Sequence, residues 1–107
     1  MFLSNRSQII SVDVTVGNFG SRTSGGQALA DAELDYKAIE AVVASYCYGE
    51  PTCGQRAVYE LGLTGVPIFN TNNNCSSGSS ALMLAKTLVE SGSYDCVMAL
   101  GRDIFFV

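Results

Sequence analysis

The alternation of apolar and polar positions predicts seven elements of secondary structure. Near-continuous apolar runs and β-branched residues favour strands, because strands covered on both faces of a parallel sheet hold few polar positions. Apolar residues spaced three and four apart favour helices. The predicted strands cover residues 8–17, 41–48, 66–70 and 95–101, and the predicted helices cover residues 28–32, 53–61 and 76–91.

Capping and turn residues predict where these helices begin and end. Two pairs have the spacing of a capping box, in which each side chain bonds the other's backbone N–H. Gly62 and Gly92 follow helical runs and would end them in a left-handed conformation. The two capping pairs are Ser24 with Gln27 and Thr52 with Gln55.

The order of the elements predicts an α/β fold. Strands that alternate with helices favour a mostly parallel sheet with helices on both faces. The 107 residues suffice for one domain, residues 1–107, and the sequence shows no repeat or linker.

Composition excludes several classes of protein. A hydrophobic content of 48% and a charged content of 15% argue against disorder. The net charge of −4 argues against nucleic acid as a partner. No apolar run reaches the roughly 20 residues of a membrane span, and the start does not resemble a signal peptide. The four cysteines include no C-x-x-C pair and the chain has no histidine, so we expect thiols and no metal site.

Cys75 is the candidate nucleophile, because it lies between a predicted strand and a predicted helix. A helix start directs free N–H groups and the positive end of the helix dipole toward the sulfur, which favours thiolate. Ser76 and Gly78 would let a substrate approach the backbone. Asn73 and Asn74 would brace the loop by hydrogen bonds. The alternative is a structural cysteine in a polar turn of asparagines, which tolerate left-handed conformations.

Three sequence blocks resemble the thiolase superfamily, and most closely its sterol-carrier-protein type, the propanoyl-CoA C-acyltransferases. The likeness runs from about Gln27 to Gly101, as judged by motif comparison. The block that contains Cys75 is the most specific. The three blocks are Thr52-Cys53-Gly54-Gln55-Arg56-Ala57, the segment from Gly62 to Ile68, and the segment from Asn70 to Leu82.

The resemblance implies the N-terminal half of a five-layered thiolase fold. It implies that Cys75 takes an acyl group from a 3-oxoacyl-CoA and passes it to coenzyme A, which is a substrate and not a bound cofactor. Its backbone N–H would contribute to an oxyanion hole. The family's members are homodimers, and the sterol-carrier type is peroxisomal and acts in lipid metabolism; some members carry a separate lipid-transfer domain. The cytoplasm is the alternative location.

The chain also departs from the family's pattern. The family's catalytic histidine and second cysteine lie in a C-terminal half that this sequence does not contain, and residues 102–107 differ from the usual continuation. We therefore expect an incomplete thiolase fold that is inactive in thiolysis by itself. Two alternatives stay open: a non-catalytic partner of a full-length thiolase, and a non-functional gene fragment.

Overall fold

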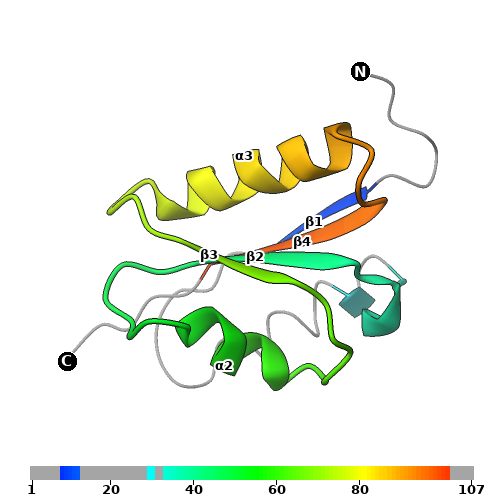
Figure 1. The fold of residues 1–107 in the computed structure, drawn as a ribbon, viewed down its shortest axis with the longest axis horizontal. Helices are drawn as coiled ribbons and strands as arrows, with labels where there is room; N and C mark the ends of the chain where they lie inside the picture. Colours follow the sequence, from blue (N-terminus) through cyan, green and yellow to red (C-terminus); the bar gives the residue numbers. More distant parts are fainter. Residues whose placement is uncertain (1–7, 13–28, 31–32, 102–107) are drawn as a thin grey trace.

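The computed structural model describes residues 8–12, 29–30 and 33–101 (Figure 1). Residues 29–30 are helical. Three predicted features lie outside the described residues. They are residues 13–17 of the first strand, the capping pair Ser24 and Gln27, and the remaining residues of the helix predicted at 28–32. The described elements are β1 (Gln8–Val12), the 3₁₀ helix η1 (Tyr36–Ala38), β2 (Ala41–Ser45), α2 (Cys53–Tyr59), β3 (Ile68–Thr71), α3 (Ser77–Glu90) and β4 (Cys96–Gly101).

The four strands form one parallel sheet in the order β1-β4-β2-β3. In the register, Val43 is paired with Ala99 of β4 and with Phe69 of β3. The predicted parallel sheet is therefore confirmed. Among the described strands, β2 and β4 are central, and β1 and β3 form the edges.

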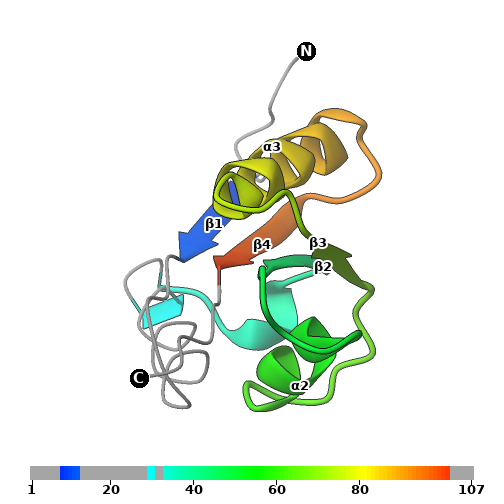
Figure 2. The ribbon, with the colours of Figure 1, turned by 90° about the vertical axis from the view of Figure 1, so that its left-hand side faces the viewer.

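One face of the sheet is covered by α3 (Figures 1 and 2). Successive side chains of a strand point to opposite faces, so alternate residues of β2 and β4 meet this helix. The helix presents small apolar residues, which let it lie close to the strands. The buried cluster comprises Ala41, Val43, Val97 and Ala99 from the sheet and Ala81, Ala85 and Val89 from α3.

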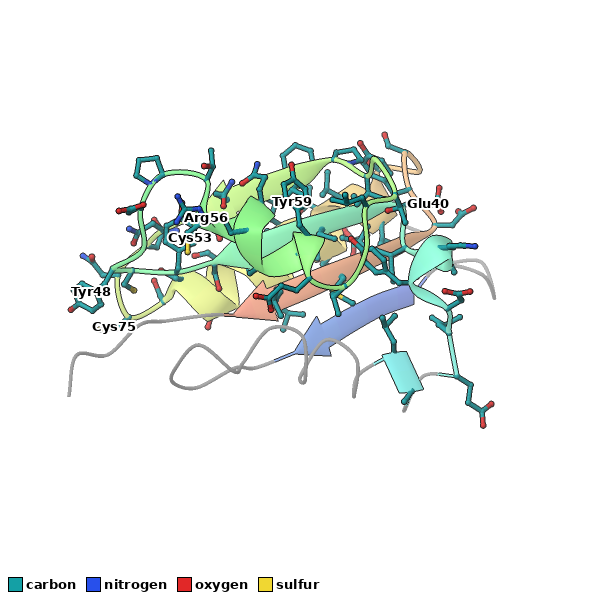
Figure 3. The ribbon with its side chains drawn as sticks, turned by 90° about the horizontal axis from the view of Figure 1, so that it is seen from below. Glu40, Tyr48, Cys53, Arg56, Tyr59 and Cys75 are labelled. Carbon is teal, nitrogen blue, oxygen red and sulfur yellow. The ribbon has the colours of Figure 1, made fainter. Side chains whose placement is uncertain are left out.

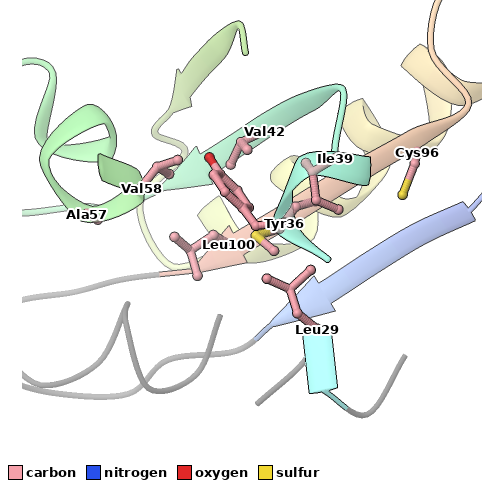
Figure 4. Packing of buried hydrophobic residues seen from close by; sticks show 9 residues of the cluster. Leu29, Tyr36, Ile39, Val42, Ala57, Val58, Cys96 and Leu100 are labelled. Carbon is pink, nitrogen blue, oxygen red and sulfur yellow. The ribbon is translucent and has the colours of Figure 1, made fainter. Parts of the chain in front are cut away.

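The other face is covered by α2 and by the segment around η1 (Figures 2 and 4). The intervening residues of β2 and β4 point to this side, so both faces are buried. This confirms the predicted sheet with helices on both faces. The cluster comprises Leu29, Tyr36, Ile39, Val42, Ala57, Val58, Cys96, Met98 and Leu100.

The strand predicted over 41–48 was too long, because β2 ends at Ser45. The backbone N–H of Tyr46 still donates to the Thr71 carbonyl, 3.2 Å away, but Thr71 is the last residue of β3. The chain then bends, and Tyr48 is exposed. The last three residues of the predicted strand, Tyr46, Cys47 and Tyr48, therefore lie outside β2.

The prediction of a capping box at the start of α2 was also wrong. Thr52 has a φ of 63°, and its side chain does not cap the helix. The Gln55 side chain instead accepts a hydrogen bond from the amide of Asn70. The predicted stop at Gly92 is confirmed: its φ is +81°, and its N–H donates to the Val89 carbonyl.

The remaining boundaries differ from the predictions by one or two residues. The third strand starts at Ile68 because Pro67 has no N–H to donate and offers only its carbonyl, to the N–H of Val42. The sequence pattern did not predict η1, which is three residues long. In the described part of the chain, no helix is long and apolar enough to cross a membrane.

Candidate active site

The loops that follow β2 and β3 lie at the same end of the sheet, where these parallel strands finish (Figure 1). Cys75 belongs to the second loop, two residues before α3 begins. Figure 3 shows it at this end, with Glu40 at the other. Cys75 is exposed to solvent. Ligand sites of open parallel sheets lie at the carboxyl ends of the strands, so this cysteine has the position that the sequence predicted.

The turn that holds Cys75 is tight. Asn74, immediately before it, has a φ of 52°, in the left-handed region that asparagine tolerates better than most residues. The N–H groups of Ser76 and Ser77 donate to the carbonyls of Asn73 and Asn74, each over 3.1 Å. The turn therefore ties the residues on both sides of Cys75 together.

Asparagine side chains brace this turn. The Asn73 amide donates to the Ser80 hydroxyl over 2.7 Å, which ties the loop to the fourth residue of α3. The Asn72 side-chain oxygen accepts from the N–H of Asn74 over 3.0 Å. Asn74 thus takes part through its backbone and Asn73 through its side chain. Their importance for catalysis stays a prediction.

Ser76 and Gly78 lie at the start of α3. Ser76 is the N-cap residue, but its hydroxyl makes no capping bond and donates to the Asn73 carbonyl over 2.9 Å. A Cβ added to Gly78 would meet no described atom within 4 Å. The backbone at Gly78 is therefore open, and packing does not require a glycine there. Contact of either residue with a substrate stays a prediction.

Cys47 joins the first loop to the second, a contact that the sequence pattern did not reveal. Its thiol donates to the Asn74 carbonyl, with 2.7 Å between sulfur and oxygen, and lies 3.5 Å from the Ser77 hydroxyl. Its own carbonyl accepts from the Asn72 amide over 3.3 Å. No sequence signal marked this contact, because it joins residues 27 positions apart.

Ser77 is a second residue that the sequence analysis missed. It is buried at 5% exposure. Its hydroxyl accepts from the N–H of Asn73 and donates to the Asn74 carbonyl, over 2.8 and 2.7 Å. A serine at a helix start is so common that no sequence signal marks this role.

The other cysteines differ in their surroundings. All four lie in the described part of the chain and are thiols. Cys53 and Cys96 are buried. Burial raises the pKa of Cys96, and the charges of Glu40 and Asp95 add to this effect. Because Cys53 is buried, its thiol is less accessible to a substrate than that of Cys75. The described residues contain no group of three or more His, Cys, Asp or Glu side chains that could hold a metal ion.

A cavity of about 340 Å³ lies elsewhere, between Tyr36 of η1 and the segment that leads from α2 to β3. Tyr59, Leu63 and Ile68 contribute to its walls, and Cys75 does not. Burial raises the pKa of Tyr36. This cavity is separate from the loop that holds Cys75.

Known proteins are similar to this chain in sequence and in fold. The thiolase N-terminal domain family matches residues 8–104. Sterol carrier protein 2 of Gallus gallus is 55% identical over 84 residues, which are 78% of this chain and 15% of that protein. Non-specific lipid-transfer protein-like 2 of Caenorhabditis elegans is 51% identical over 76 residues, which are 71% of this chain and 18% of that protein. The chain thus spans less than a fifth of the length of these two relatives.

A solved structure has the same fold. It is 3-oxoacyl-[acyl-carrier-protein] synthase III from Aquifex aeolicus VF5, with a TM-score of 0.70 and 20% sequence identity. The likeness covers 79% of this chain and 29% of that chain. Because the family match covers most of the sequence and the parallel sheet has the corresponding fold, the chain belongs to the thiolase family of acyltransferases, and residues 8–104 match the N-terminal domain of that family.

Proposed function

We propose that Cys75 is the acyl-accepting nucleophile of a thiolase-type acyltransferase. The observation that carries this proposal is the exposed thiol just before α3, at the carboxyl ends of parallel strands. The thiolate attacks the carbonyl carbon of an acyl-CoA thioester. A new carbon–sulfur bond forms, the bond to CoA breaks, and CoA leaves as a thiolate that takes a proton from solvent.

The start of α3 supports the charge that develops during this attack. The first N–H groups of a helix have no intrahelical acceptor, and the Ser76 side chain does not cap them. We assign the N–H of Cys75 to the oxyanion hole, as the family likeness implies. Donors aimed at a developing oxyanion supply a large part of acyl-transfer catalysis. Ser76 and the open backbone at Gly78 would contact the substrate, while Asn73 and Asn74 hold the loop.

The family likeness supports a substrate class and a setting for this chemistry. We propose acyl-CoA and free CoA as substrates, within lipid metabolism, with no bound cofactor. The relatives' names mention sterol carriage and lipid transfer, which agrees with a lipid-derived acyl group. We propose the peroxisome as the location, with the cytoplasm as the alternative.

The proposal is tested by exposing the chain to an acyl-CoA and locating the acyl group. Trypsin cleaves after Arg56 and Lys86, so the released peptide 57–86 contains Cys75 as its only cysteine. Mass spectrometry should find one acyl group on this peptide, and none after Cys75→Ala. An adduct that forms at equal rates on the peptides of all four cysteines would contradict the proposal.

We further propose that two copies of the chain associate through β3. This strand is an edge of the described sheet, and an unpaired edge offers N–H and C=O groups to a second strand. Phe69 in the middle of β3 is 38% exposed, which adds apolar area to that edge.

Analytical ultracentrifugation should therefore find a dimer that Phe69→Glu weakens at least tenfold, because two like charges would face each other across the edge. The control is Leu63→Glu, which adds the same charge to an exposed residue outside the strands. A monomer at all concentrations, or equal weakening by both variants, would refute association through β3.

A further inference from the structure

Cys47 contacts the loop that holds Cys75, although it lies 27 residues before Asn74, its partner in that loop. It follows β2, whereas Cys75 follows β3. Its thiol donates to the Asn74 carbonyl over 2.7 Å, and its carbonyl accepts from the Asn72 side chain over 3.3 Å. One residue therefore contacts the loop through both its side chain and its backbone.

The Asn74 carbonyl belongs to the same peptide group as the N–H of Cys75. A trans peptide is planar, so its C=O and N–H point in opposite directions; the described chain contains no cis bond. A group that fixes the direction of the Asn74 carbonyl therefore also fixes the direction of the Cys75 N–H.

Three donors converge on this carbonyl oxygen: the N–H and the hydroxyl of Ser77, and the thiol of Cys47. The Ser77 hydroxyl donates over 2.7 Å from within the turn, and the Cys47 thiol donates from the neighbouring loop. Ser77 is the first residue of α3, so its two bonds tie the peptide to the helix that follows it. Cys47 lies two residues after the central strand β2, so its bond ties the same peptide to a second, separate segment of the fold.

We propose that Cys47 is a positioning residue for acyl transfer: its thiol holds the Asn74–Cys75 peptide so that the Cys75 N–H points at the oxyanion. This inference rests on the proposed function of Cys75. Cys47 does not touch the reacting atoms; it acts through the peptide that it orients.

Two reactions of Cys75 distinguish this role from general support of the fold. Acylation by an acyl-CoA builds negative charge on the carbonyl oxygen and needs the N–H donor. Alkylation by iodoacetamide displaces iodide at a saturated carbon and forms no oxyanion. Both adducts are measured on the peptide 57–86, which does not contain Cys47. The ratio of the two rate constants therefore reports on the oxyanion donor.

We expect Cys47→Ala to lower the acylation rate of Cys75 about tenfold, part of the roughly 10²–10³-fold cost of removing an oxyanion donor outright. The alkylation rate should change less than about twofold. Cys47→Ser keeps a hydroxyl donor and should restore most of the acylation. Cys53→Ala is the matched control, since Cys53 is a buried cysteine of α2. If Cys47→Ala does not fold, Cys47→Val replaces it, because valine fills similar space without a donor.

An unchanged ratio in Cys47→Ala, or an equal fall of both rates, would overturn the positioning role. Failure of the unaltered chain to acylate at Cys75 would overturn the proposed function itself. The two failures are distinguishable, because the second appears before any variant of Cys47 is made.

Discussion

The purified 107-residue chain is expected to take up one acyl group at Cys75 and then stop. The sequence contains no histidine, so the imidazole that usually serves as general base or acid in cysteine catalysis is absent. General acid–base catalysis contributes about 10²–10⁴-fold to such steps. Thiolysis also requires that the C2–C3 bond of a 3-oxoacyl-CoA breaks and that a proton reaches the departing carbon. The side chains that hydrogen-bond the loop around Cys75 are those of asparagine, serine and cysteine, and none of them is an imidazole.

The measurement follows the consumption of a 3-oxoacyl-CoA in the presence of free CoA. We expect no cleavage of the C2–C3 bond; an acyl group reaches the peptide 57–86 only by exchange at the CoA thioester, in at most one equivalent per chain, and CoA is released. Cys75→Ala should carry no acyl group on this peptide, and its signal gives the background of the measurement. Repeated turnover that disappears in Cys75→Ala would show that the chain supplies its own base, and would contradict this expectation.

A methyl group at Gly54 is expected to destabilise the fold. Gly54 is the second residue of α2 and is buried. Its N–H donates to the side-chain oxygen of Asn70 on β3 over 2.9 Å. A Cβ at this position would lie 2.2 Å from that oxygen and 2.7 Å from the Cβ of Ala44 on β2. The helix lies so close to the strands that only a hydrogen atom fits between them.

We expect Gly54→Ala to reduce the free energy of unfolding by about 2 kcal/mol, because overpacking costs roughly 1–3 kcal/mol and a displaced hydrogen bond about 1 kcal/mol. A better helix propensity returns part of this loss. Urea unfolding followed by circular dichroism should show the midpoint at lower urea, with an unchanged slope.

The matched control is Gly78→Ala. Gly78 is also the second residue of its helix, but a Cβ there meets nothing within 4 Å. This substitution should leave stability unchanged or raise it by up to about 1 kcal/mol through helix propensity. If both substitutions shift the urea midpoint equally, the requirement for glycine at position 54 does not come from the close packing of α2 against β2 and β3.

Much of the architecture could be predicted from local patterns. The apolar runs of β2 and β4 indicated strands buried on both faces, and α3 was recognisable from its helical spacing. Helix ends that depend on a glycine in the left-handed region, such as Gly92, were also predictable. Local steric and burial preferences decide such features, because they act between residues close in sequence.

Contacts between distant segments were not predictable. The capping box at Thr52 failed because Gln55 finds a better partner in Asn70, which lies 15 residues away on β3. The end of β2 depends on where β3 stops, and the strand order depends on which edges pair.

The sequence by itself determined the fold class, the family and the candidate nucleophile, because helical and strand periodicity and the motif around Cys75 are local properties of the chain. Only the tertiary structure decided that Cys47 bonds to the Asn74 carbonyl and that Gly54 fits against Asn70. Both contacts join loops or elements that the parallel sheet brings together, and their geometry follows from strand register rather than from sequence spacing.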